Sequence, residues 1–559
     1  NLCVIFKKNR MIIRKAIFSI FLILLCLLSC KKSTTPEFET WVPYDETGLI
    51  ENNANHDNER LRYKLIQSKI SDRNKLIEGI TAQLQDFSVE RYIELTPYIL
   101  DQNIIKLQDN IADGIFTYKE LSQWYLYRIA DFESDKDLAL NAMISINPNL
   151  VDQAEKLDDE DKDQKNLIFG MPIILKDNIN TNNMPTTAGA VALQNNQPKQ
   201  DAEIVTNIKS HGGLILGKAN LSEWANFLCE GCPNGYSAIG GQTLNPYGPR
   251  DFDTGGSSSG SAVSVAMNYA PVAVGTETSG SILSPSSQQS VVGLKPTIGV
   301  LSQDGIVPIS STLDTAGPIS KCIEDNSILF SAMATSADDN FEQKIPWQIE
   351  TKKSLNGIRL GAFKTYSQDS LYQNAITDLK KLGAEIIEIE PEQMNFEGFL
   401  DLLNADMKID LKNYLSSYGS ETVEVKSAYE VMQFNLKDSL VRIPYGQARF
   451  EGVYETNITD SELIEIRTKL LKSGIDYFDK PMQTHNLDAV LSINNYNAGQ
   501  AAAAKYPALT VPMGYNDEGA PMGLTFISKP KTEADIYSIA QLYENTSKRR
   551  KSPILNDKK

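Results

Sequence analysis

The strongest restriction on the fold of this 559-residue chain comes from two glycine-rich loops that carry serines. The first loop is GGSSSGS at residues 255–261, and the second is GTETSGS at residues 275–281. The stretch between them, residues 262–274, is mostly small and apolar, so it can pack as a helix or a strand close to its neighbours. Glycine lets a backbone approach another segment where a side chain would collide. The two loops therefore predict a site built from serine hydroxyls and backbone groups.

A lysine upstream of the loops supplies a further part of this candidate site. Lys176 lies in GMPIILKDNINT, where the apolar run at residues 171–175 predicts a buried strand with the lysine at its end. A serine hydroxyl is a weak nucleophile and needs a base. A lysine that burial deprives of its proton can be that base.

These residues resemble the amidase signature family, serine hydrolases that use a Ser-cisSer-Lys triad. The likeness rests on GGSSSGSA, GTETSGSI, VVGLKPTIG and ILKDNINT, which stand in the family's order. It extends from about residue 115 to about residue 544, with a poorly matched middle. The resemblance implies an α/β fold, in which one large domain contains a mixed central β-sheet covered by α-helices on both faces.

The resemblance also assigns roles to single residues. It implies Ser281 as the nucleophile, Ser257 as the serine that relays the proton and Lys176 as the base, with a cis peptide bond before Ser257. The implied oxyanion hole consists of the backbone N–H groups of Thr278, Ser279, Gly280 and Ser281. Two residues depart from many relatives, since Ser279 replaces glycine or aspartate and Leu283 replaces arginine. The resemblance implies no cofactor and no metal.

The expected substrate class follows from further blocks. GTETSGSI, SQDGIVPIS and DTAGPIS are most similar to the peptide amidase branch, which releases ammonia from C-terminal peptide amides. The expected partner is thus a small-molecule or peptide amide, and the oligomeric state stays open. Two alternatives share the signature: a catalytically inactive substrate-binding lipoprotein, and an amidotransferase A-type subunit, which is cytosolic and works with a tRNA-bound partner.

A third alternative is an esterase of the α/β-hydrolase type. GSSSG at residues 256–260 matches the G-x-S-x-G nucleophile elbow, with Ser258 as the nucleophile. The elbow follows directly on a strand, whereas RDFDTG before this block is polar and turn-like. It also needs a later histidine, and only His485 is available. We expect His485 to be a surface residue.

The start of the chain resembles a bacterial lipoprotein leader. From Met11 a basic stretch is followed by an apolar run at residues 16–28, and LLSC ends at Cys30. The run is shorter than the roughly 20 residues of a membrane span. We expect residues 1–29 to be upstream residues and a signal peptide, Cys30 to be lipidated, and residues 30–85 to be a tether. The expected location is the bacterial cell envelope; an uncleaved N-terminal anchor is the alternative.

Composition indicates an ordinary globular enzyme after this leader. Hydrophobic residues make up 41% and charged residues 22%, and no low-complexity linker divides residues 86–559, which we expect to form the amidase domain. The net charge of −17 argues against binding to nucleic acid or to an anionic membrane surface, so the lipid is the only expected membrane contact.

Secondary-structure signals add local expectations. Residues 86–109 are expected to be helical and to pack outside the core. In the weakly matching region, residues 357–362 and 385–390 are predicted strands around a helix at residues 370–381. The variable region at about 346–480 is the candidate substrate cap.

Cysteine usage leaves one question open. Cys229 and Cys232 form CEGC, which is half of a zinc motif, but Cys322 and three histidines are too few for a four-ligand set. In an oxidising envelope a local disulfide is favoured over zinc. The two-residue gap strains such a ring, so free thiols remain the alternative.

Overall fold

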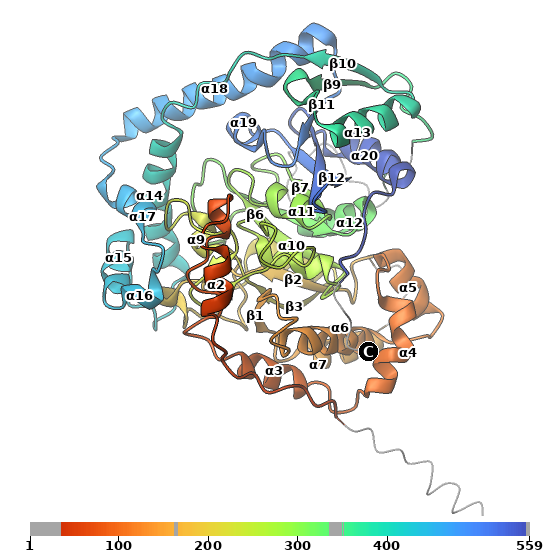
Figure 1. Ribbon diagram of the computed structural model, residues 1–559, viewed down its shortest axis with the longest axis vertical. Coiled ribbons are helices and arrows are strands. Elements are labelled where there is room, and N and C mark those ends of the chain that lie inside the picture. Colours follow the sequence, from red (N-terminus) through yellow and green to blue (C-terminus); the bar gives the residue numbers. More distant parts are fainter. Residues whose placement is uncertain (1–34, 161–165, 335–348, 350–351, 555–559) are drawn as a thin grey trace, which may run out of the picture.

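A mixed sheet of eleven strands forms the centre of the computed structural model, which describes residues 35–160, 166–334, 349 and 352–554 (Figure 1). In spatial order its strands are β1 (Met143–Ile146), β3 (Leu214–Ala219), β2 (Pro172–Lys176), β6 (Val272–Glu277), β8 (Thr315–Ser320), β7 (Val292–Lys295), β12 (Ala508–Tyr515), β13 (Pro521–Ile527), β11 (Ala489–Ile493), β9 (Arg359–Phe363) and β10 (Glu385–Ile389). A separate two-stranded ribbon consists of β4 (Tyr236–Ser237) and β5 (Gly241–Gln242). The predicted mixed α/β sheet is confirmed.

The site lies where the sheet changes from parallel to antiparallel pairing. Strand β2 is parallel to both β3 and β6, while β6 pairs antiparallel with β8. Parallel neighbours need a crossover, and helices α8 (Glu203–Ser210) and α10 (Ser259–Ala266) provide it before β3 and β6. Every residue of β2 and β6 is buried, as expected of strands covered on both faces.

Helices cover both faces of the sheet. Helix α10 packs on β6 and against α11 (Leu283–Gln288), which packs on β12 and β13. A second group is a row of helices in which α12 (Ile323–Met333) contacts α8 and α20 (Glu533–Ser547), and α20 contacts α13 (Ser370–Lys381). The remaining helices of this part are α6 (Tyr118–Glu133), α7 (Leu150–Asp158), α9 (Glu223–Asn226) and α19 (Ala498–Ala504), with 3₁₀ turns at Glu59–Leu61, Val191–Leu193 and Lys364–Tyr366.

The N-terminal segment differs from the predicted tether. Residues 47–81 contain α2 (Thr47–Asn53) and α3 (Arg73–Thr81), and Leu61, Ile66 and Ile80 lie in the main core with at most 2% of their surface exposed. The packed part of the chain therefore begins before residue 86. Residues 1–34, including Cys30 and the predicted leader, lie outside the described residues.

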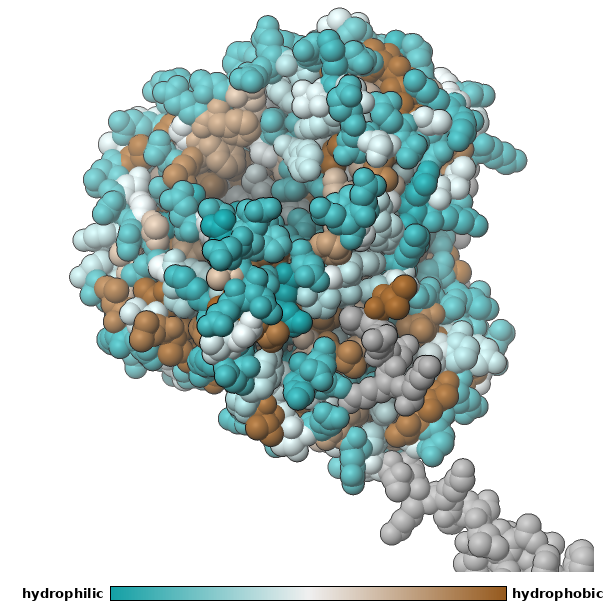
Figure 2. All heavy atoms as spheres, in the orientation of Figure 1, coloured by the Kyte–Doolittle hydropathy of each residue, from teal (hydrophilic) through white to brown (hydrophobic). Residues whose placement is uncertain are grey.

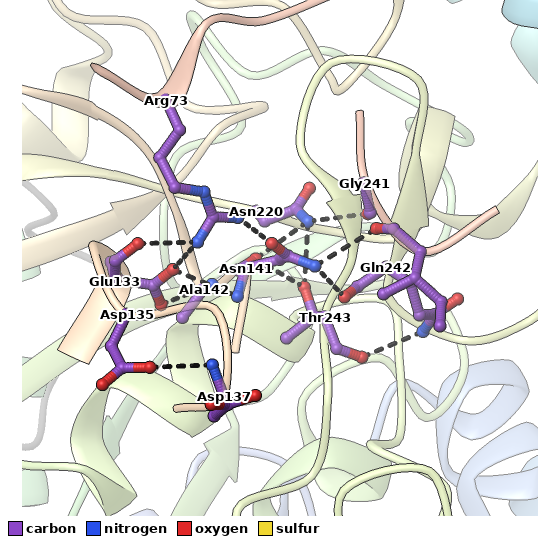
Figure 3. A network of polar contacts seen from close by, with 11 residues as sticks. Arg73, Glu133, Asp135, Asp137, Asn141, Ala142, Asn220, Gly241, Gln242 and Thr243 are labelled. Carbon is purple, nitrogen blue, oxygen red and sulfur yellow. Dashed lines mark hydrogen bonds and ion pairs between the residues drawn. The ribbon is translucent and has the colours of Figure 1, made fainter. Parts of the chain in front are cut away.

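A polar network fastens this N-terminal segment to the sheet (Figure 3). Arg73 donates to the buried carboxylate of Glu133 at 2.9 Å and also contacts the side chain of Asn141. Asn220, which directly follows β3, donates to the Asn141 carbonyl at 3.0 Å. Removing one partner would leave a buried charge or amide unpaired, which is costly.

Helices α4 (Val89–Ile99) and α5 (Ile104–Ala112) correct a second expectation. Residues 86–109 are mostly helical as predicted, but residues 100–103 separate two helices, and these do not pack outside the core. Leu95, Ile99 and Ile104 are fully buried, because the apolar positions recur at helical spacing on the face that contacts the domain.

The predicted cap region divides into two parts. Strands β9 and β10 with helix α13 extend the central sheet, so they belong to its edge. The remaining part holds the helices α14 (Phe399–Tyr418), α15 (Ala428–Leu436), α16 (Ser439–Arg442), α17 (Ala448–Glu455) and α18 (Asp460–His485). They share a second hydrophobic core with residues from the segments 188–232 and 307–313. Figure 2 shows a largely hydrophilic face with hydrophobic side chains gathered in a hollow beneath α18. No helix among the described residues has the length and apolar character to cross a membrane.

Candidate active site

Lys176 ends strand β2 and is completely buried. Its Nζ donates to Ser257 Oγ at 2.7 Å, to Thr276 Oγ1 at 2.8 Å and to the Thr276 carbonyl at 3.0 Å. An ammonium has three N–H donors and the neutral amine has two donors and a lone pair. When Lys176 is neutral, Thr276 accepts both N–H bonds and the lone pair faces Ser257.

Burial brings the proton affinity of Lys176 into the working range of a base. Desolvation lowers its pKa to about 7, although the negative charges of Asp314 and Glu277 act in the opposite direction. A pKa near neutrality means that about half of the lysine is unprotonated at pH 7. An exposed lysine, with a pKa near 10.4, would be almost entirely protonated.

Ser257 lies in the first glycine loop, directly beside Lys176. The Gly256–Ser257 peptide bond is cis, as the family resemblance implies, and the Ser257 carbonyl accepts from the Ser222 amide at 3.1 Å. A Cβ at residue 256 would lie 2.5 Å from Ser222 Oγ, so a larger residue here would displace the Ser222 side chain. Ser257 is fully buried.

Ser281 lies in the loop between β6 and α11, and 9% of its surface is exposed, against 0% for Lys176 and Ser257. The Ser281 carbonyl accepts from the Ser258 amide at 3.0 Å, which holds the two glycine loops together. Gly280 before it has φ +96°, a region that favours glycine. The structure thus brings all three predicted triad residues to the ends of β2 and β6.

Glu277 fixes the second loop, although sequence reasoning did not select it. This buried carboxylate accepts from the amides of Ile282 at 2.7 Å and Leu283 at 2.9 Å. Burial raises its pKa, and the nearby Lys295 and these amides oppose the rise. Glu277 and Thr276 belong to the GTETSGSI block, but no local pattern distinguishes them from loop residues. Of the two residues that depart from many relatives, Ser279 is exposed and Leu283 is buried.

The elbow residues do not meet. Ser258 is fully buried, and its Oγ donates to the Thr276 carbonyl and accepts from the Thr276 amide. His485 ends α18, where its carbonyl accepts from Arg359 at the start of β9. Strands β6 and β9 are six positions apart in the sheet, roughly 29 Å at about 4.8 Å per strand. Ser258 and His485 therefore cannot form one catalytic pair.

Comparison with known proteins agrees with this geometry. The Amidase family model matches residues 123–536. A probable amidase of Arabidopsis thaliana is 34% identical over 465 residues, covering 78% of this chain and 88% of the relative. A glutamyl-tRNA(Gln) amidotransferase subunit of Shouchella clausii is 30% identical over 488 residues, covering 80% and 98%. The crystal structure of the peptide amidase from Stenotrophomonas maltophilia is 33% identical and superposes with a TM-score of 0.75, covering 82% of this chain and all of that one.

This chain belongs to the amidase family. It is an amide-hydrolysing enzyme with the family's α/β fold and a likeness to peptide amidase, so the expected family membership is confirmed.

The amidase has a cavity of about 220 Å³ that adjoins the two loops of the site through Thr276 and Thr278, although Lys176, Ser257 and Ser281 do not line it. Thr276, which holds Lys176, and Thr278, in the second loop, lie in its wall. Further wall residues come from the segment 303–315 before and at the start of β8 and from helix α14 of the predicted cap region. The cap helix thus contributes to the space that adjoins the two loops.

The cysteines of the amidase form a local link. Cys229 and Cys232 are joined in a disulfide, with their Cα atoms 5.9 Å apart. Of the two possibilities that the sequence left open, a local disulfide and free thiols, the structure has the disulfide. Within the part of the chain that the structure describes, no group of three or more His, Cys, Asp or Glu side chains is arranged to hold a metal ion.

Proposed function

We propose that this amidase hydrolyses a primary carboxamide through an acyl-enzyme on Ser281. Ser281 Oγ attacks the amide carbonyl and passes its proton to Ser257, which passes its own proton to Lys176. Ser257 then returns a proton to the nitrogen as ammonia leaves. Water, activated by the same relay, attacks the acyl-enzyme and releases the carboxylic acid.

The observation that carries this proposal is the contact between Lys176 Nζ and Ser257 Oγ at 2.7 Å in a fully buried environment. A base must lie within hydrogen-bond reach of the proton it takes, and its pKa is best near the working pH. Lys176 meets both conditions, since its pKa is lowered to about 7.

The developing oxyanion requires donors that are fixed before the reaction begins. We assign this role to the backbone N–H groups of Thr278, Ser279, Gly280 and Ser281. The Glu277 carboxylate supports the assignment, because its bonds to the Ile282 and Leu283 amides hold the end of this loop. Loss of one such donor typically costs about 3 kcal/mol in the transition state.

The proposed substrates are C-terminal peptide amides. The likeness to the Stenotrophomonas maltophilia peptide amidase supports this choice. The test is ammonia release by the purified chain from peptide amides, fatty amides and aryl amides, with Ser281→Ala as the control. Faster turnover of peptide amides supports the proposal, and a preference for fatty or aryl amides contradicts the substrate class. Hydrolysis without tRNA or a second protein separates the enzyme from an amidotransferase component.

The nucleophile assignment has a separate test. A fluorophosphonate should label wild type and Ser258→Ala but not Ser281→Ala. Labelling that persists in Ser281→Ala and is lost in Ser258→Ala would contradict the proposal, and no labelling of the wild type would favour an inactive binding protein.

The N-terminal sequence carries a proposal about location. LLSC supports lipidation of Cys30 and attachment to the bacterial cell envelope. Metabolic labelling with a clickable fatty acid should mark the wild type and not Cys30→Ser. Equal labelling of both proteins would reject the anchor.

A further inference from the structure

The cavity that Thr276 and Thr278 help to line has acidic side chains in its wall. Asp304, Asp314 and Asp410 lie in its wall, and none of the described residues that line it is a lysine, arginine or histidine. We call it the aspartate cavity. Asp304 and Asp314 belong to the loop between β7 and β8, whereas Asp410 comes from cap helix α14. Two segments distant in sequence thus place carboxylates around one space.

Each carboxylate is held in place by a donor on one side. Asp314 accepts from Thr278 Oγ1 at 2.6 Å and from the Ile309 and Ser310 amides at 2.8 and 3.0 Å. Asp410 accepts from the Ser311 amide at 2.7 Å, and Asp304 accepts from the Tyr418 hydroxyl. A carboxylate has about four acceptor positions, so each retains acceptor capacity after these bonds.

The negative charges repel one another across the cavity. The pKa of Asp314 is raised to about 6, chiefly by burial and in part by the charge of Asp410, while its hydrogen bonds oppose the rise. Burial also raises the pKa of Asp410, with Asp406 adding to the effect. Arg467 pairs with Asp406, and its charge partly opposes the rise in the pKa of Asp410. Lys176 donates to Thr276 and does not line the cavity. The repulsion would be relieved by a positive charge inside the cavity.

A second observation points to a hydrogen-bond donor. Asn178 lies in the cavity wall and is 2% exposed, and its Oδ1 has no hydrogen-bond partner among the described residues. Its Nδ2 donates to Thr276 Oγ1 at 3.0 Å and to the Val307 carbonyl at 3.3 Å, which fixes the orientation of the amide. Buried acceptors without partners are rare in folded proteins, so this oxygen indicates a missing donor.

We infer that the aspartate cavity binds an ammonium or guanidinium group of the amide substrate, so that the enzyme prefers cationic amides. This inference rests on the proposed function. A volume of about 220 Å³ is below the roughly 300–1,000 Å³ of pockets that hold whole drug-sized ligands, and it suits one side chain or terminal group. The cation is either the side chain of a basic residue or the free α-ammonium of a short peptide amide.

The bound cation would also act on the base. The charge of Asp314 raises the pKa of Lys176. A substrate cation paired with Asp314 offsets that charge and keeps Lys176 unprotonated at lower pH. The acidic limb of the kcat profile for a cationic amide should therefore lie at lower pH than that for its neutral analogue.

Matched substrates test the inference. N-acetyl-lysinamide against N-acetyl-norleucinamide tests the side-chain cation, and unblocked norleucinamide against its N-acetyl form tests the α-ammonium. We expect a kcat/KM at least about tenfold higher for a cationic member of one pair at low salt, equivalent to about 1.4 kcal/mol. Asp410→Asn and Asp304→Asn should reduce this ratio several-fold. Asp401→Asn, which removes an exposed carboxylate from the same helix outside the cavity, should leave the ratio unchanged.

A binding measurement separates this inference from the proposed function. Calorimetric titration of Ser281→Ala with the same amides reports affinity without turnover. Hydrolysis of cationic and neutral amides at equal rates, with equal affinities, would overturn the inference while the amidase function stands. Selective binding of a cationic amide without hydrolysis by the wild type would support the cavity and contradict the proposed reaction. Equal loss of preference in Asp401→Asn and Asp410→Asn would assign the effect to overall charge and overturn the inference.

Discussion

Replacement of Lys176 by arginine tests the central chemical assignment. Arginine keeps a positive charge but does not lose its proton in proteins. If Lys176 is the base, Lys176→Arg should be as inactive as Lys176→Met. If Lys176 only stabilises charge, arginine should retain much of the activity. The comparison isolates proton acceptance from charge.

The expected magnitude follows from the burial of Lys176. With a pKa of about 7, the unprotonated fraction falls about tenfold for each pH unit below 7 and saturates above about pH 8. The kcat/KM of the wild type should rise with pH over this interval, because the deprotonated form is the active one. General-base catalysis typically contributes about 10²–10⁴-fold, so both variants should lose at least about a hundredfold at pH 8.

The assay is kcat/KM from about pH 5.5 to about pH 9 on one primary amide, with ammonia release as the readout. The apparent pKa belongs to the coupled Lys176 and Ser257 pair. Lys218→Arg is the matched control, since Lys218 is equally buried but donates to Asp177, away from the serines. A Lys176→Arg enzyme with most of the wild-type rate, or a wild-type profile flat below pH 7, would refute the base assignment.

Four further predictions concern the same region. Ser257→Ala should leave a small residual rate, because Ser281 and the oxyanion donors remain and only the relay is interrupted; a rate equal to wild type would exclude the relay. Gly280→Ala should lower kcat strongly, because residue 280 has φ +96° and the new Cβ would lie 2.9 Å from Asn495 Nδ2. The control is Gly299→Ala, since residue 299 has a similar φ of +93° but open space around it. This control should lose about 1–3 kcal/mol of stability and keep its kcat. Lys176→Met should raise Tm at pH 6. The folded-state pKa of Lys176 lies below its unfolded value, so the wild type is penalised most below pH 7 and the advantage of methionine should shrink as pH rises towards 10; an advantage that grows with pH would contradict this. Dialysis against a strong chelator should leave turnover unchanged, and zinc-dependent recovery of lost activity would contradict the backbone oxyanion hole.

Local patterns located much of the fold and site. The apolar run before Lys176 predicted strand β2, and the limits of helix α13 at residues 370–381 agree with the predicted ones. These signals are local, because hydrophobic periodicity and capping depend on residues a few positions apart. The prediction of a tether at residues 30–85 was wrong for its packed part, since Leu61 and Ile66 find their partners only in the folded core.

The site residues that sequence reasoning missed share one property. Glu277, Asn178 and Asp314 act through contacts with segments that lie elsewhere in the chain or through backbone groups that a loop exposes only once folded. The sequence does not distinguish a buried carboxylate from an exposed one, and the role of a carboxylate depends on which hydrogen-bond donors surround it. The carboxylate of Asp410 is a further case, because α14 must dock on the loop before β8 to bring it into the cavity wall.

The sequence by itself determined the chemical inventory: two serine-bearing glycine loops, a lysine at the end of a buried strand and the family to which this arrangement belongs. Tertiary structure alone decided the relative positions of these groups, their burial and the pKa of the lysine. The pairing of β2 with β6 places Lys176 against Thr276 and Ser257, and the surrounding layers remove it from water. A lysine's pKa depends on solvation and neighbouring charge, both of which are properties of three-dimensional packing, so the same residue becomes a base only in the folded protein.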